Sequence, residues 1–116
     1  MKLPGGGGAV VSRGKVLDYL LSPSHPQGRY KAAVVLRHGF TRKEWTIFAD
    51  ALRAHAVENE VCREETSPFG RRFVVEGILK VPEGRAPMVR TVWFVERGDT
   101  VPRLVTAYAV ERREGR

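Results

Sequence analysis

Apolar and polar positions alternate with two different periods along this chain of 116 residues. Up to about Glu58 the apolar residues recur at every third or fourth position, which is typical of amphipathic helices. Beyond Glu58 they recur at every second position, which is typical of strands that bury one face. The pattern predicts an α+β fold in which about three N-terminal helices pack on a four-stranded antiparallel β-meander.

The first two helices are predicted on either side of a proline-rich loop. Ser12 can cap a helix that runs to Leu21, just before a proline that ends it. Residues 22–28 contain two prolines, a histidine and a glycine, and are expected to form the loop. A second helix follows and ends at Gly39, although the β-prone residues 34–36 leave a strand open as an alternative.

The third helix has the clearest local signals. Thr41 and Glu44 stand at the spacing of a capping box. Apolar residues follow at helical period, namely Trp45, Phe48, Ala49, Leu52 and Ala56.

Four strands are predicted after residue 58, joined by short turns. The expected strands span 60–65, 71–81, 88–95 and 101–110, with turns at 67–70, 82–85 and 97–99. The third of them is apolar on both faces, as a central strand should be.

Length and composition limit how the chain can be divided. A chain of 116 residues, 42% of them hydrophobic, supports one hydrophobic core but not two. We therefore expect a flexible Gly-rich arm with a short extended segment at 1–12, a single domain at 13–110 and a frayed charged tail at 111–116. No apolar run is long enough for a membrane span or a signal peptide, so we expect no membrane partner. The single Cys62 cannot form an internal disulfide, which adds to the expectation of a cytoplasmic protein.

The charge of the chain is strongly basic and unevenly distributed. The net charge is +7, and residues 1–57 carry 9 basic and 3 acidic side chains against 11 and 10 in residues 58–116. Clustered Lys and Arg favour polyanionic partners, because they release counterions from phosphates. The charge therefore indicates RNA as a candidate partner, with the excess in the helical half.

Metal and thiol chemistry are both disfavoured. No pair among His25, His38 and His55 has the spacing of ligands on one helix turn, and we expect neither a metal nor another cofactor. Cys62 lies among carboxylates of an expected edge strand, which would raise the pKa of its thiol and weaken it as a nucleophile.

Polar residues within the apolar strands are the most suggestive feature. Arg90 lies in the expected central strand, where an unpaired buried charge would be very costly. One interpretation is an ion pair with Glu76 on the neighbouring strand. The other is a phosphate clamp, in which the hydroxyls of Thr106 and Tyr108 complete an anion site.

RNA cleavage without a metal requires a base for the 2′-hydroxyl, an acid for the leaving oxygen and cations for the phosphorane. His25, Lys31, Arg90 and Thr106 supply these types of group. The plainer interpretations remain a solvated loop histidine for His25 and an exposed helical lysine for Lys31. Spacing alone does not tell whether the four converge.

Five strings in the chain resemble a known family: Tyr19-Leu20-Leu21, Ser24-His25-Pro26, Gly28-Arg29-Tyr30-Lys31-Ala32, Val89-Arg90-Thr91-Val92-Trp93 and Pro102-Arg103-Leu104-Val105-Thr106-Ala107-Tyr108. They resemble a family of small bacterial single-domain proteins, domain of unknown function 6883, over nearly the whole chain. The order of helices and sheet is also similar to that of the metal-independent ribonuclease toxins that include barnase, colicin nucleases and RelE-type toxins, which is a likeness of fold.

The resemblance also implies a departure at Tyr30, where members of the family often carry histidine. If that histidine is the catalytic base, this protein is impaired, and His25 or Tyr30 would have to substitute for it.

The leading hypothesis is a toxin-like, metal-independent endoribonuclease or a degenerate relative of one. In it Lys31, Arg90 and Thr106 contact the scissile phosphate and His25 acts as base or acid. The neighbouring residues expected to bind the substrate are Arg29, Tyr30, Arg103 and Tyr108. Its partners would be RNA and a cognate antitoxin or operon partner protein. The alternatives are a non-enzymatic RNA- or protein-binding module of a small bacterial operon, and an interaction protein whose polar strand residues are only structural.

Overall fold

The computed structural model describes residues 1–22, 24–26 and 29–110. Its helical elements are a 3₁₀ turn at Gly6–Gly8, α1 at Arg13–Lys15, a π-helical turn at Val16–Leu20 that continues α1, α2 at Arg29–Arg37 and α3 at Trp45–Glu58. Its strands are β1 at Val61–Ser67, β2 at Gly70–Ile78, β3 at Met88–Glu96 and β4 at Arg103–Ala109. The predicted α+β fold is confirmed, and residues 34–36 lie in a helix.

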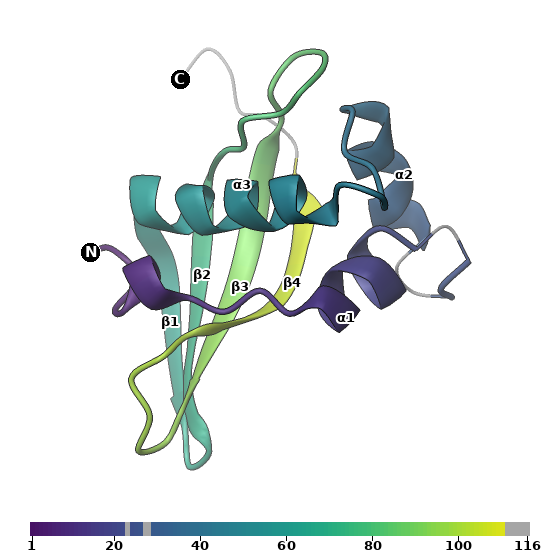
Figure 1. Cartoon of the computed structure of the whole chain (residues 1–116). Helices are drawn as coiled ribbons and strands as arrows, with labels where there is room; N and C mark the ends of the chain where they lie inside the picture. Colours follow the sequence, from purple (N-terminus) through teal and green to yellow (C-terminus); the bar gives the residue numbers. More distant parts are fainter. Residues whose placement is uncertain (23, 27–28, 111–116) are drawn as a thin grey trace.

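The strands form one antiparallel sheet in the order β1-β2-β3-β4. Figure 1 shows α3 lying across one face of this sheet, while α1 and α2 stand beside β4. Side chains of β3 alternate between the two faces, so that Thr91 and Trp93 lie in the core and Arg90 points to the other side. We call that other side, which carries Glu76, Arg90 and Tyr108, the open face.

The two predicted caps lie at different places relative to their helices. The Ser12 hydroxyl caps α1 by accepting a hydrogen bond from the Lys15 amide at 3.1 Å. The Thr41 hydroxyl accepts one from the Glu44 amide at 3.1 Å in the turn before α3, whose N-cap residue Glu44 makes no side-chain cap bond. The Leu21 amide then donates to the Val16 carbonyl at 2.7 Å, which is the longer loop of a π turn. None of the helices in the described part of the chain has the length and apolar character needed to cross a membrane.

The core lies between α3 and the sheet and includes Phe48, Leu52, Phe73 and Trp93, all essentially buried. His55 of α3 is buried with them. Its Nε2 lies 3.1 Å and 3.0 Å from the carbonyl oxygens of Gly77 and Val89, and its Nδ1 lies 3.2 Å from the Thr91 hydroxyl.

Two carbonyl neighbours can only accept, so Nε2 of His55 carries the proton and Nδ1 accepts from Thr91. The Thr91 oxygen in turn accepts the indole N–H of Trp93 at 2.9 Å. Burial lowers the pKa of His55, which keeps the ring neutral and makes it a structural tie between α3 and the sheet.

A β-bulge shapes the outer edge of the sheet. Thr106 pairs with Val92 and Leu104 pairs with Trp93, so Val105 has no partner across the ladder. The extra residue lets Leu104 enter the core while Val105 and Thr106 both remain accessible. The bulge therefore places Thr106 where residues of the neighbouring helices can reach it.

We expected residues 1–12 to form an arm with a short extended segment; in the structure they lie along the domain. Leu3, Ala9 and Val11 are buried, and Val10 runs parallel to β4 beside Arg103. The Val10 amide donates to the Pro102 carbonyl at 2.9 Å, and the Leu104 amide donates to the Val10 carbonyl at 2.9 Å. This segment thereby extends the surface next to β4. The predicted tail at 111–116 lies outside the described residues.

Candidate functional site

Lys31 is held by two hydroxyl groups from different parts of the fold. Its ammonium nitrogen donates to the Tyr19 hydroxyl at 2.5 Å and to the Thr106 hydroxyl at 3.0 Å. Lys31 comes from the first turn of α2, Tyr19 from the π-helical turn and Thr106 from β4 beside the bulge. No carboxylate in the described residues forms an ion pair with Lys31. The positive charge is thus available to an anionic ligand.

Tyr19 is electrostatically coupled to this lysine. The hydrogen bond from Lys31 lowers the pKa of Tyr19; partial burial opposes it, and Thr106 together with the charges of Lys31 and Lys15 adds to the decrease. The Lys31 nitrogen also lies 4.8 Å from the centroid of the Tyr19 ring, and that of Lys15 lies 5.4 Å from it. A phenol in this setting gives up its proton more readily than an isolated tyrosine.

His25 lies against the same tyrosine. The two rings meet edge to face with centroids 4.9 Å apart. Together with Gly14, Lys15, Asp18, Val105 and Thr106, they line a hollow at the surface. The hollow thus brings together an imidazole, a phenol and a hydroxyl, and the Lys31 ammonium adjoins it. We call the group His25, Tyr19, Thr106 and Lys31 the lysine site.

Arg90 forms the ion pair that was the plainer of its two interpretations. Its Nε and Nη2 lie 2.9 Å and 2.7 Å from one carboxylate oxygen of Glu76, its partner in the register of β2 and β3. Its Nη1 donates to the Tyr108 hydroxyl at 3.2 Å, and these bonds, first to Tyr108 and then to Glu76, raise the pKa of Arg90 above its ordinary value. The carboxylate offsets the charge that a phosphate clamp would need.

Tyr108 connects this ion pair with the lysine site. Its ring centroid lies 5.4 Å from the Lys31 nitrogen and 5.6 Å from the guanidinium carbon of Arg90. The arginine and Tyr108 also line a polar hollow on the open face with Cys62, Arg63 and Glu76. Lys31 and Arg90 therefore flank one aromatic ring, but only Lys31 lacks a carboxylate partner among the described residues.

The other residues expected to bind substrate are more dispersed. Arg103 lies near the far end of β4 and pairs with Glu96 at 2.5 Å. Arg29 is exposed at the start of α2, and the side chain of Tyr30 lies outside what the structure describes. Sequence reasoning missed Tyr19 as a site residue, although it stands four positions after Lys15 within the first predicted helix.

The structure also describes Cys62 and the side chains that could bind a metal. Burial, and then the Glu76 carboxylate with its oxygen 3.6 Å away, raise the pKa of the Cys62 thiol, in agreement with its predicted weakness as a nucleophile. Among the described residues no group of three His, Cys, Asp or Glu side chains lies together as metal ligands would.

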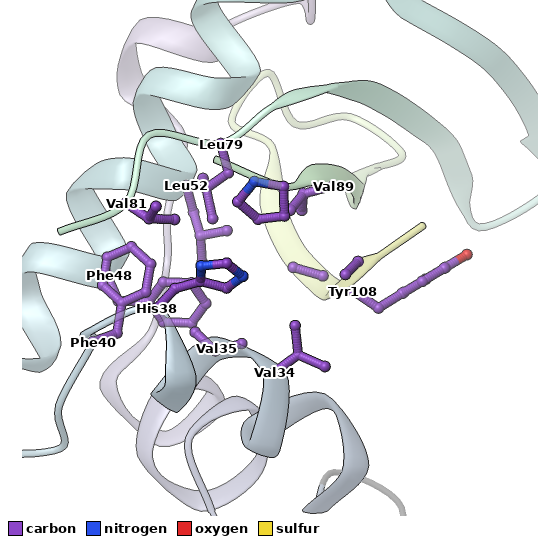
Figure 2. A pocket seen from close by; sticks show the side chains of 13 residues that line it. Val34, Val35, His38, Phe40, Phe48, Leu52, Leu79, Val81, Val89 and Tyr108 are labelled. Atoms are coloured by element: carbon purple, nitrogen blue, oxygen red, sulfur yellow. The ribbon is translucent and has the colours of Figure 1, made fainter. Parts of the chain in front are cut away.

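An apolar cavity of about 20 Å³ lies between α2, α3 and the sheet, with room for about one water molecule. Figure 2 shows His38, Phe40 and Phe48 on one side of it and Tyr108 at its edge, with the Tyr108 hydroxyl directed away. The cavity is too small for a substrate, and none of the four residues of the lysine site lines it.

Comparison with known proteins gives a family and a fold. One chain of the "contact-dependent growth inhibition toxin - immunity protein complex from Klebsiella pneumoniae 342" superposes with a TM-score of 0.72 at 20% sequence identity, covering 92% of this chain and 97% of that one. At that identity the similarity is one of fold. No protein with a curated description matches the sequence significantly.

The family comparison bears on the resemblance seen in the sequence. The family model described as "Domain of unknown function (DUF6883)" matches residues 2–111, almost the full length of the chain. The chain therefore belongs to the DUF6883 family.

Proposed function

We propose that this protein is a toxin-type endoribonuclease that cleaves RNA without a metal. The observation that carries the proposal is the lysine site, in which the Lys31 ammonium lies between the hydroxyls of Tyr19 and Thr106 beside the imidazole of His25. These groups supply an acid and a base within one surface hollow and a cation beside it, which is the set that transesterification at phosphorus requires.

In the proposed reaction the His25 imidazole accepts the proton of the ribose 2′-hydroxyl as its oxygen attacks the adjacent phosphorus. The bond from phosphorus to the 5′-oxygen breaks, and Tyr19 donates its proton to that leaving oxygen. The products are a 2′,3′-cyclic phosphate and a free 5′-hydroxyl. Lys31 stabilises the charge that develops on the non-bridging oxygens, and Thr106 fixes the direction of its ammonium group.

Arg90 has a different role in this scheme from the one we first considered. Because Glu76 and Tyr108 hold its guanidinium, we assign it as a positioning residue that orients the Tyr108 ring against Lys31. The basic surplus of the helical half attracts the RNA backbone to the same side of the molecule.

The fold comparison supports a role in a toxin system. The similar structure is a complex of a contact-dependent growth inhibition toxin with its immunity protein, and this chain covers nearly all of the matched chain. We extend this to the present protein as part of the proposal, with a protein inhibitor or antitoxin as its partner.

A cleavage assay with purified protein tests the proposal. Wild type is incubated with end-labelled RNA in the presence of EDTA, and we expect fragments that end in 2′,3′-cyclic phosphate. Lys31→Ala should reduce the rate by about 100-fold or more. Lys80→Ala removes the same charge at an exposed lysine that pairs with Glu58 and should leave the rate unchanged.

Three outcomes would refute the proposal. They are intact RNA with the wild-type chain, cleavage that EDTA abolishes, and equal rates for Lys31→Ala and Lys80→Ala.

A second candidate function is favoured by the Arg90–Glu76 pair. An arginine neutralised by a carboxylate is typical of a structural or partner-binding surface, and the similar complex contains an immunity protein as well as a toxin. A non-enzymatic module would bind RNA or a protein without cleaving RNA. The cleavage assay separates this candidate from the nuclease.

A further inference from the structure

A second groove adjoins the lysine site along β4. Its lining residues are Val10, Ser12, Lys15, Phe94, Arg103, Leu104 and Val105. Lys15 and Val105 also line the hollow that contains Tyr19, His25 and Thr106. The two depressions therefore share a wall and form one continuous surface, and we call the new one the flanking groove.

We propose that the flanking groove binds a nucleotide of single-stranded RNA next to the phosphate held at the lysine site. This inference rests on the proposed function, because it assigns the groove to the same substrate. An unpaired nucleotide offers an apolar base face and an anionic phosphate, and the groove presents surfaces that complement both.

The floor of the groove is apolar and accessible. Val10 and Val105 are 47% and 36% exposed, and half-buried Phe94, which is on the same side of β3 as Arg90, lines the groove with them. The bulge at Val105 and the parallel attachment of Val10 to β4 produce this exposure. Accessible apolar side chains around an aromatic ring provide a surface on which a base can stack.

The ring of Phe94 is fixed in place by the neighbouring strand. It lies over Gly70, where an added Cβ would come within 2.8 Å of its Cζ atom. Glycine at this position leaves room for the ring to pack against the backbone of β2. A ring that is already ordered loses little conformational entropy when a base stacks on it.

Two cations stand at the sides of this floor. Lys15 has no carboxylate partner in the described residues and lies over the Tyr19 ring, towards the lysine site. Arg103 pairs with Glu96, but their side chains are 60% and 54% exposed. Such an exposed pair is weak, so a phosphate can compete with Glu96 for the guanidinium.

Binding of a short RNA tests the inference without depending on cleavage. The probe is a fluorescent single-stranded RNA whose 2′-hydroxyls are all methylated, and its affinity is measured by fluorescence anisotropy. Phe94→Leu should weaken binding about fivefold or more, since a stacked base is lost. Lys15→Ala should reduce the slope of log K against log salt by about 0.7, the value for one phosphate contact on a single strand.

Matched controls lie outside the groove. Phe69→Leu makes the same change at a ring that is 78% exposed in the turn between β1 and β2, and Lys80→Ala removes a distant lysine charge. Both should bind RNA as wild type does. Thermal unfolding of each variant shows whether it is folded under the assay conditions.

The outcomes separate this inference from the proposed function. If wild type does not cleave RNA but Phe94→Leu and Lys15→Ala change its binding as expected, the nuclease proposal fails and the groove stands. If wild type cleaves RNA and the folded Phe94→Leu and Lys15→Ala variants bind like their controls, the groove assignment is overturned. Failure of wild type to bind the probe, or equal binding of an RNA duplex, would also overturn it.

Discussion

At the scale of single residues, the bonding of Lys31 explains how the site can hold an anion. Two hydroxyl groups orient the ammonium without neutralising it, whereas Glu76 offsets much of the charge of Arg90. Both cations touch the Tyr108 ring, but they differ in what they can offer a phosphate. Because of this difference, we propose Lys31 rather than Arg90 as the cation that contacts the phosphate.

The coupling of Lys31 and Tyr19 can be measured without any substrate. We expect the pKa of Tyr19 to lie below the ordinary tyrosine value, because the ammonium stabilises the phenolate. In Lys31→Met, which keeps much of the length of the side chain, the pKa should rise towards that value. NMR titration of the labelled tyrosine Cζ atoms resolves the effect, and an unchanged Tyr19 titration would contradict it.

The phenol of Tyr19 has its own expected contribution to catalysis. Tyr19→Phe removes the proposed acid while keeping the ring against His25, and should lower kcat for RNA cleavage by about 100-fold or more. An RNA with a sulfur in place of the 5′-leaving oxygen needs little protonation, so it should be cut by Tyr19→Phe at nearly the wild-type rate. An equal loss on both substrates would argue against Tyr19 as the acid.

At the scale of elements, His55 ties α3 to β2 and β3. Burial lowers its pKa, partly opposed by its two carbonyl contacts and by the charge of Glu58. Below pH of about 6.5 the unfolded chain takes up a proton that the folded His55 does not. The free energy of unfolding should therefore fall as the pH decreases from 6.5 towards the folded-state pKa.

This pH effect can be assigned by two measurements. The His55 ring resonances should stay at their neutral positions through pH 6.5, and urea unfolding should show stability decreasing from pH 7 to pH 5. His38→Gln, at a half-buried ring beside the Glu83 carbonyl, serves as the control for the loss of an imidazole ring. A His55 ring that titrates with an ordinary midpoint would contradict the structural role.

The hairpin of β1 and β2 depends on a glycine. Gly70 has φ of 153°, and a Cβ there would lie 2.2 Å from the Val95 carbonyl oxygen. Gly70→Ala should destabilise the fold by about 2 kcal/mol or more, because neighbouring backbone must move. Gly7→Ala, where nothing lies within 4 Å of the added atom, should have little effect on the urea midpoint. Equal midpoints for the two variants would contradict the packing described at this turn.

Sequence patterns predicted most of the elements but not how their residues meet. The period change at Glu58, the Ser12 cap and the turns between strands are local signals, and each appears in the structure, whereas α3 begins at Trp45 and is not capped by Thr41. The site depends on contacts that local signals do not encode. Thr106 is 75 residues from Lys31, and a π turn and a β-bulge set the positions of Tyr19 and Thr106.

His55 illustrates a different limit of sequence reasoning. Among the three histidines it was considered only as a metal ligand, since its partners Thr91, Gly77 and Val89 lie on distant strands. The ion pair of Arg90 with Glu76 was one of the two interpretations that the sequence offered, because antiparallel pairing places Glu76 directly opposite Arg90. Pairing across neighbouring strands follows from the pattern, whereas contacts between helices and strands do not.

At the scale of the whole molecule, the sheet and the helical half contribute different parts of the structure. The sheet and α3 form the core together with buried residues of the N-terminal segment and the π-helical turn, while Lys15, Tyr19 and Lys31 from the helical half lie beside β4. The lysine site and the flanking groove lie along the β4 edge, and their Lys15 and Lys31 belong to residues 1–57, which hold most of the positive surplus. The arrangement is consistent with our proposal that this small basic domain cleaves RNA at one edge of its sheet.

Induced expression in bacteria measures the central claim most directly, with growth and the integrity of cellular RNA followed together. We predict growth arrest and RNA fragmentation with wild type and with Lys80→Ala, and normal growth with intact RNA for Lys31→Ala at equal protein levels. Normal growth and intact RNA with the folded wild-type protein, or arrest by Lys31→Ala equal to that by wild type, would contradict the account.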